Sequence, residues 1–324
     1  MTELHGNDIL PERIRVGVSA CLLGHEVRFD GGHKRSRFIT DELAACFDFV
    51  SFCPEVAVGL GIPRQPIRLV GEPGSPRALG VRDPGLDVTR SLRAYGCEVA
   101  GKIDDLCGFI FKKDSPSCGM ERVRLYDDKG MPERVATGLF AKEIMAAQPL
   151  LPVEEEGRLN DADLRDNFVT RVYVYARWKE LQAGQPDKAS LVSFHARHKY
   201  LVLAHSTVMY RKLGRLLADL GRRPLEEISA SYISDLMLAL SRPATRKRHT
   251  NVLQHLLGYL KNNLDSAHRR DLADSIDAYR RGEYPLVVPL RLLQHHFSIH
   301  PHPYISEQVY LNPHPRGLKL RNTL

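Results

Sequence analysis

Three of the six cysteines in this 324-residue sequence follow strand-like apolar runs. Cys21 and Cys53 end the runs at residues 15–21 and 49–53, and Cys118 lies in the polar turn 112–119 that follows the run 107–111. Parallel strands end at a common sheet edge, where α/β proteins bind ligands. The pattern therefore predicts that the three thiols gather at one edge.

The number and spacing of these thiols favour some metals over others. The close cysteine pair typical of structural zinc sites is absent from the sequence. Iron–sulfur clusters normally take four cysteines, so three would leave one iron open, as catalytic metal sites require. A cluster is one hypothesis. The alternative is that the three cysteines are small buried apolar residues without a metal, as most free cysteines are. Cys46, Cys97 and Cys107 lie away from the turns and are expected in the core.

Five polar residues near these turns are candidates for hydrolytic chemistry: Glu55, Ser117, Ser115, Asp30 and Lys112. A carboxylate near a metal can manage the protons of an attacking water. Each residue also has a structural interpretation. Glu55 suits the first turn of a helix, the serines suit a turn, and Asp30 precedes a glycine in a turn signal.

Alternating strands and helices predict an α/β fold with a mostly parallel sheet for the first half of the chain. Its expected strands are 14–21, 48–53, 67–70, 107–112 and 122–126, and its main expected helices are 40–47, 89–103 and 137–147. Residues 71–84 are expected to be a loop, and residues 151–158 a connector. The second half is mainly helical in period, with helices expected at 163–181, 191–220, 246–262 and 266–282. The predicted domains are 12–155 and 161–324.

The charge is divided unevenly between the halves. Residues 161–324 hold 25 Lys and Arg against 15 Asp and Glu, whereas residues 1–160 hold 21 against 24. A basic module of this kind favours a polyanionic partner, or else a solvated surface without one. No apolar run approaches a membrane span, and the first eleven residues are polar, so a cytoplasmic protein is expected.

Two basic stretches are candidate nucleic-acid contacts. One stretch opens a predicted helix and consists of Arg246, Lys247, Arg248 and His249. Cations at the start of a helix are disfavoured by the helix dipole, so bound phosphates would explain why they are there. The second stretch contains His195, His198 and Lys199, whose histidines are predicted to share one helical face with His205. Core packing is the alternative for these histidines. The histidines of the tail, residues 285–324, are expected at the surface.

Four motifs in order resemble the 2-thiouracil desulfidase family: residues 19–24, 28–31, 53–55 with 63–64, and 115–119. The resemblance covers about residues 12–155. The second half resembles the helical domain often fused to this family, through residues 194–199, 204–206, 246–258 and 310–313. The combination is similar to the bacterial tRNA 4-thiouridine desulfidases.

The resemblance implies that Cys21, Cys53 and Cys118 hold a [4Fe–4S] cluster whose open iron takes the sulfur of the substrate. It further implies non-redox hydrolysis, with Glu55, or Ser117 with a lysine, handling protons. Thiolated tRNA is the implied partner, with the second domain engaging it. The alternatives are a desulfidase of free thiouracil or a thionucleotide such as thio-UMP, a non-catalytic nucleic-acid-binding iron–sulfur protein, and a structural zinc protein.

Overall fold

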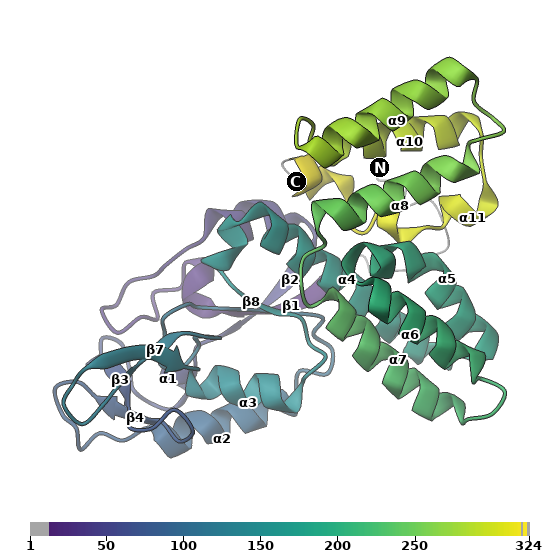
Figure 1. Ribbon diagram of the computed structural model, residues 1–324. Helices are drawn as coiled ribbons and strands as arrows, with labels where there is room; N and C mark the ends of the chain where they lie inside the picture. Colours follow the sequence, from purple (N-terminus) through teal and green to yellow (C-terminus); the bar gives the residue numbers. More distant parts are fainter. Residues whose placement is uncertain (1–12, 319, 323–324) are drawn as a thin grey trace. The chain divides into compact units, whose positions relative to one another are not determined.

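The computed structural model describes residues 13–318 and 320–322, which fall into two compact units, Pro11–Asn160 and Asp161–Leu324 (Figure 1). The first is an α/β unit and the second is helical. In the described ranges, no helix is both long and apolar enough to cross a membrane.

The α/β unit contains eight strands, three α-helices and several short turns of other helix types. The strands are β1 Ile14–Ser19, β2 Phe47–Phe52, β3 Ile67–Val70, β4 Arg77–Gly80, β5 Phe109–Phe111, β6 Val123–Tyr126, β7 Pro132–Ala136 and β8 Val153–Glu155. The α-helices are α1 Pro54–Ala57, α2 Thr89–Ala100 and α3 Leu139–Ala147. The helix expected at 40–47 is instead a π-helical turn, Phe38–Glu42, followed by a 3₁₀ turn, Leu43–Ala45.

The predicted parallel sheet is confirmed and has the order β2-β1-β5-β8, with every pair parallel. Its central strand β1 is buried at five of six positions, which explains its continuous apolar sequence. Gly17 of β1 faces the ring of Phe109 so closely that an added Cβ would lie 2.4 Å from it. The glycine therefore lets an aromatic group pack against the sheet, with Phe109 and Phe111 stacked at 4.3 Å.

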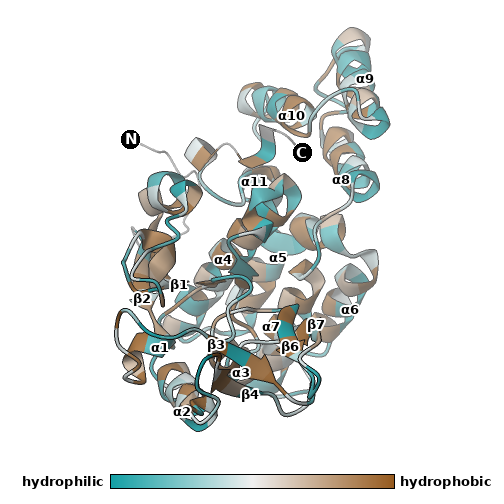
Figure 2. Ribbon diagram, turned by 90° about the vertical axis from the view of Figure 1, so that its left-hand side faces the viewer, coloured by the Kyte–Doolittle hydropathy of each residue, from teal (hydrophilic) through white to brown (hydrophobic). Residues whose placement is uncertain are grey.

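A second sheet, which was not predicted, has the order β4-β3-β6-β7. It is mixed, since β3 and β6 are parallel while β4 and β7 pair antiparallel at its edges. The segment 71–84 was expected to be a loop, but its end forms β4 by returning beside β3. The ribbon of the α/β unit alternates between hydrophobic and hydrophilic stretches (Figure 2), and α2 and α3 pack side by side (Figure 1).

The expected connector at 151–158 is also wrong, because it contains β8. Val153 and Glu155 pair with Phe109 and Phe111 and complete the parallel sheet. The acidic sequence hides the strand because its carboxylates are used locally. Glu155 accepts from the Met120 amide at 2.8 Å, and Glu154 accepts from Arg158 at 2.6 Å.

The helical unit contains eight α-helices in its described residues. They are α4 Ala162–Ala183, α5 Lys188–His205, α6 Thr207–Ala218, α7 Leu225–Leu240, α8 Arg246–Tyr259, α9 Ser266–Arg281, α10 Val287–Ile299 and α11 Pro303–Ser306. The single helix expected at 191–220 is wrong. Ser206 adopts an extended backbone conformation and its hydroxyl accepts from the Met209 amide, so it ends α5 and caps α6.

The tail packs into the helical unit rather than lying at its surface. His314 Nε2 lies 2.7 Å from an Asp166 oxygen, and Arg321 donates to the Tyr310 carbonyl at 2.8 Å. All four residues are buried. The surface expectation for the tail histidines is therefore wrong for His296 and His314, which are both buried, and His314 joins a buried polar group with Asp166 of α4.

Buried histidines make the helical unit sensitive to acid. Burial lowers the pKa of His205 to about 4 and that of His249 to about 3. Below the ordinary histidine pKa of about 6.5, these histidines bind protons in the unfolded chain but stay neutral in the folded protein. The free energy of unfolding therefore falls as the pH is lowered from about 6.5 toward the pKa values of the folded protein. At pH 5 the loss is on the order of 2 kcal/mol for each ring. Thermal unfolding followed by the single tryptophan, Trp178 in α4, should show a lower Tm at pH 5 than at pH 7.5; an unchanged Tm would contradict this account.

Candidate active site

Cys21 and Cys53 emerge side by side from neighbouring strands. Ser19 at the end of β1 pairs with Phe52 at the end of β2. Cys21 follows in the 3₁₀ turn Ala20–Leu23, and Cys53 follows as the N-cap of α1. This placement is the one predicted from the two apolar runs.

Cys118 reaches the same edge from the loop after β5, the strand on the other side of β1. Ser19 connects the two segments, since its hydroxyl accepts from the Lys112 amide at 2.9 Å and donates to the Cys118 sulfur. The three cysteines also influence one another electrostatically: charge on Cys21 and Cys53 raises the pKa of Cys118. The structure therefore brings all three thiols together.

Burial dominates the protonation of these thiols. It raises the pKa of Cys21 to about 11, raises that of Cys53, and raises that of Cys118 well above its ordinary value. The Lys112 and Arg28 charges partly oppose the shift at Cys21. Two of these thiols are buried and Cys53 is half-buried, so a cation among them would favour their thiolate forms, and soft sulfur donors suit iron.

The donors are three thiols that come from three separate segments of the chain. Among the residues that the structure describes, no three His, Cys, Asp or Glu side chains converge as ligands of one metal ion. Cysteines that bind a cluster each take a different iron, so they need not converge on one point. Three sulfurs from three segments at one buried edge fit that requirement.

The Cys118 loop is held in place by the start of α3. The Ser115 hydroxyl accepts from the amides of Ser117 and Cys118 at 3.2 and 3.0 Å. The Ser117 carbonyl accepts from the Ala141 amide at 3.1 Å, which satisfies a free donor of the first helical turn. Gly138 permits this approach, because an added Cβ would lie 2.6 Å from the Ser117 carbonyl. Ser115 therefore stabilises the turn, which is the structural interpretation that the sequence allowed for it.

Glu55 and Ser117 form the polar pair beside the thiols. The Ser117 hydroxyl, which is fully buried, donates to Glu55 Oε1 at 3.0 Å. The other carboxylate oxygen, Oε2, accepts from Arg64 Nε and Nη2 at 3.0 and 2.7 Å. The Glu55 carboxylate thus has one oxygen committed to a cation and the other to a hydroxyl beside Cys118.

Arg64 is the functional residue that the sequence analysis missed. It follows a proline in a loop and was noted only as part of a motif. Its side chain is 5% exposed and also donates to the carbonyls of Val27 and Gly61 at 2.9 Å each. The only sequence signal for this role was an isolated arginine shortly after Glu55 in a loop rich in glycine and proline.

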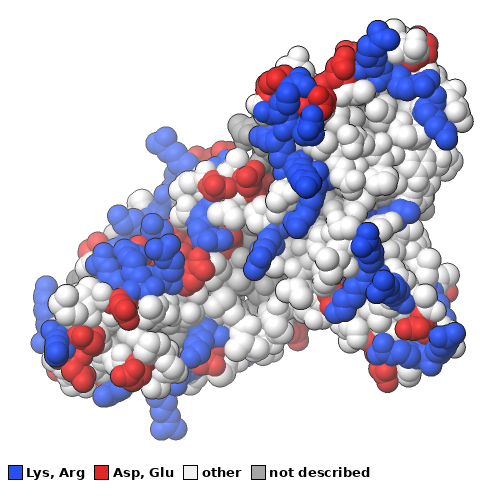
Figure 3. All heavy atoms as spheres, viewed as in Figure 1, with Lys and Arg blue, Asp and Glu red and all other residues white. Residues whose placement is uncertain are grey.

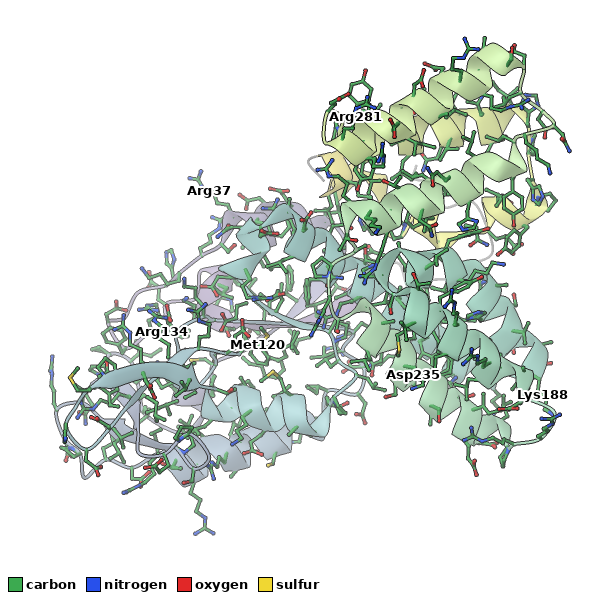
Figure 4. All side chains as sticks on the ribbon, in the orientation of Figure 1. Arg37, Met120, Arg134, Lys188, Asp235 and Arg281 are labelled. Carbon is green, nitrogen blue, oxygen red and sulfur yellow. The ribbon has the colours of Figure 1, made fainter. Side chains whose placement is uncertain are left out.

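Lys112 and Asp30 lie at the margins of this group. The Lys112 ammonium is ion-paired with Glu156 and also donates to the Lys113 carbonyl at 3.1 Å. Asp30 is exposed and accepts from the Gly32 amide at 3.1 Å, as expected of a turn residue. Arg134 of β7, which is labelled in Figure 4, donates to Asp114 of the turn before Cys118 at 2.7 Å.

The remaining cysteines are dispersed. Cys107 is buried as expected and Cys46 is half-buried. Cys97 is exposed on α2, with its sulfur 3.7 Å from a Glu143 oxygen, so the core expectation is wrong there.

The candidate nucleic-acid residues differ in burial, and only some of them reach solvent. His198 and His249 are in the core, where His249 bonds the Tyr310 hydroxyl at 2.9 Å, so their proposed phosphate contacts are wrong. The helical spacing that groups these histidines marks the face toward the core. His195 is half-buried against the Tyr232 hydroxyl at 3.2 Å, and the Lys199 ammonium lies 4.6 Å from the ring centre of Tyr304.

The basic start of α8 is exposed but partly occupied by structural bonds. Arg246 donates to the Tyr279 carbonyl at 2.8 Å, and Arg248 donates to the His205 carbonyl at 2.7 Å. Lys247 lies between them and is exposed. Figure 3 shows that Lys and Arg side chains on the visible face of the helical unit form several separate groups.

A parallel sheet that delivers three thiols and a carboxylate–hydroxyl pair to one edge defines an α/β protein with a thiol-rich site. Comparison with known proteins then gives the family. The family model described as 2-thiouracil desulfurase matches residues 16–156, and the chain belongs to this family of desulfidase enzymes. A second family model, described as a protein of unknown function (DUF1722), matches residues 199–315.

Individual relatives cover parts of the chain. The uncharacterized protein YbgA of Escherichia coli (strain K12) is 36% identical over 159 residues, 49% of this chain and 94% of that protein. The uncharacterized protein YbbK of Bacillus subtilis (strain 168) is 33% identical over 111 residues, 32% of this chain and 71% of that protein. A solved structure described as the [4Fe-4S]-dependent thiouracil desulfidase TudS is 32% identical and covers 46% of this chain and 94% of its own, with a TM-score of 0.36.

Proposed function

We propose that this protein is a [4Fe–4S]-dependent desulfidase that hydrolyses 4-thiouridine to uridine in tRNA. The observation that carries the proposal is the hydrogen bond from Ser117 to Glu55, directly beside Cys118 at the edge where the three thiols meet. This arrangement supplies a proton acceptor next to a sulfur-rich metal site.

Cys21, Cys53 and Cys118 would hold the cluster. With three protein ligands, the bound cluster offers one open iron, a soft Lewis acid that can polarise the C=S bond of a thione. The buried thiols must lose their protons when they bind it. The Glu55 and Val56 amides help at Cys53, because they donate to its sulfur and lower its pKa against the effect of burial.

The chain's own residues manage the protons of the attacking water. Hydrolysis replaces C=S with C=O: water supplies the oxygen, the sulfur leaves with two protons as hydrogen sulfide, and no electrons are gained or lost. The Ser117 hydroxyl already donates to Glu55, so its oxygen is free to accept a proton from water while its own proton passes to Glu55 Oε1. Arg64 keeps the carboxylate aimed at Ser117, because two of its guanidinium donors bind the opposite oxygen.

The helical unit is the proposed tRNA-binding part. Its excess of ten positive charges supports this role. The buried His198 and His249 take no part in this role. Arg246 and Arg248 are used in structural hydrogen bonds, so Lys247 at the exposed start of α8 is the remaining candidate.

The direct test uses the full chain purified without oxygen and tRNA that contains 4-thiouridine. We expect the near-ultraviolet absorbance of 4-thiouridine to disappear with release of one sulfide per base. A protein that carries its cluster and leaves this absorbance unchanged would refute the proposed tRNA activity.

Salt dependence tests the electrostatic part. If about six phosphates are contacted, tRNA binding should weaken by about 10³-fold between 50 and 200 mM salt. Turnover of free thiouracil, which is uncharged, should change little over the same range. The Lys247→Ala variant should lower the salt slope, with Lys212→Ala on α6 as the control, since Lys212 is paired with Asp235 at 2.6 Å. A slope near zero for the unaltered chain would contradict tRNA binding.

A second candidate substrate is free thiouracil, which the description of the matching family names. The comparison is between kcat/KM for 2-thiouracil and for thiolated tRNA with the same protein. A higher value for the free base would make it the main substrate and would leave the helical unit a structural role.

A further inference from the structure

An exposed aromatic side chain lies in the loop beside the three thiols. Phe29 is 37% exposed, so part of its ring reaches solvent. It sits in a tight turn closed at both ends, where the Arg28 amide donates to the Gly32 carbonyl at 3.2 Å and the Gly31 amide donates to the Arg28 carbonyl at 3.0 Å. The turn fixes the backbone from which the ring projects.

This turn is tied to the site by Arg64. The Arg64 amide donates to the Phe29 carbonyl at 2.9 Å, and its guanidinium donates to the Val27 carbonyl at 2.9 Å. The same guanidinium binds Glu55. The Cys53 sulfur lies 3.7 Å from the Val27 carbonyl oxygen. Phe29 is thus two residues from a direct contact with a thiol of the site.

Arg28 fixes the ring from one side. Its guanidinium carbon lies 5.3 Å from the centre of the Phe29 ring, within cation–π range, and its side chain is half-buried. The part of the ring that remains exposed is open to a ligand.

We propose that Phe29 is the platform on which the thiolated pyrimidine stacks, and that Arg28 is the residue that positions its ring. This proposal rests on the proposed function and names a binding element for the same site. Because every base has a flat π-face, stacking recognises a planar thiopyrimidine as a free base or as an unstacked base of an RNA loop alike. It gives no such contact to an open-chain thioamide, which has no flat ring.

The test measures binding as well as turnover. Uracil, the desulfurised product, binds without reacting, so its Kd for the cluster-loaded full chain can be measured by calorimetry. Phe29→Ala should raise this Kd, and the KM for 2-thiouracil, about 10- to 100-fold, with iron content unchanged. Phe29→Tyr keeps an aromatic face and should remain within about threefold. Phe29→Leu keeps apolar bulk without the ring and should behave like Phe29→Ala.

The second sheet of the α/β unit offers a matched control. Arg68 lies 5.1 Å over the ring of Tyr126, the same kind of pair as Arg28 and Phe29 but on the strands β3 and β6. Tyr126→Ala should leave uracil binding unchanged. A Phe29→Ala protein that binds uracil as the unaltered chain does would overturn the proposal, and so would an equal loss in Tyr126→Ala. Failure of the unaltered chain to turn over any thiopyrimidine would instead refute the proposed function, and the turnover assay shows this independently of the uracil Kd.

Discussion

Replacing Cys53 with serine is expected to leave the purified protein without its iron. A serine hydroxyl is a hard donor that stays protonated, so two thiolates would remain for a cluster that needs three. Iron and sulfide, expected at about four each per chain in the unaltered protein, should fall to near zero. Cys21→Ser and Cys118→Ser should have the same effect.

The Cys53 position separates ligation from folding. Cys53 is the N-cap of α1, a position at which serine is favoured, so the helix should start equally well in the variant. Its Tm should therefore match that of the unaltered protein without cluster. Cys97→Ser on the exposed surface of α2 and Cys46→Ser are the controls and should keep full iron content. Loss of iron from either control would show that the ligand assignment is wrong.

Replacing Glu55 with glutamine is expected to lower kcat by about 10²- to 10⁴-fold, the usual contribution of a general base. The amide keeps the shape of the carboxylate but cannot take a proton. Iron content should not change, because Glu55 is not one of the proposed ligands. Steady-state kinetics on 2-thiouracil, with iron analysis of the same sample, measure both quantities.

Glu156→Gln is the matched control for this substitution. Glu156 is as little exposed as Glu55, at 15% of the side chain, and it too is paired with a cation, Lys112. Both variants leave a largely buried cation without its partner and should lose stability. Only Glu55→Gln should lose turnover to the stated degree. An equal loss of kcat in Glu156→Gln would mean that charge balance, not proton transfer, explains the effect.

Ser117→Ala provides a second reading of the same step. If Ser117 passes its proton to Glu55, the two residues act as a unit, and the double variant should be little slower than either single variant. Losses that multiply in the double variant would show that they act independently.

The parts of the site that sequence predicts are those created by strand ends. The apolar runs before Cys21 and Cys53 form β1 and β2, whose ends are adjacent, because a parallel sheet leaves few other places for them. Cys118 lies seven residues beyond β5, so its position depends on the turn at Ser115 and on the carbonyls that accept from α3. The bonds from the α3 amides link segments more than twenty residues apart, and no local pattern reveals them.

The parts that sequence does not predict depend on polar pairing at a distance. Arg64 binds Glu55 nine positions away and Val27 across 37 positions, so its neighbours in sequence carry no sign of its role. The strand β8 was missed because its acidic sequence resembles a solvent-exposed segment, whereas its glutamates accept hydrogen bonds from a backbone amide and an arginine. In the helical unit, the same helical period marks His198 and His249 for the core or for a ligand, and burial alone distinguishes the two.

Arg64 has a mechanical consequence for the site. One guanidinium holds both the carboxylate of Glu55 and the carbonyl of Val27, while the Arg64 amide holds that of Phe29. When thermal motion displaces the loop, the carboxylate is pulled along with it, so the distance between the two changes less than either moves. We therefore expect the loop and the carboxylate to stay aligned with each other when either of them moves.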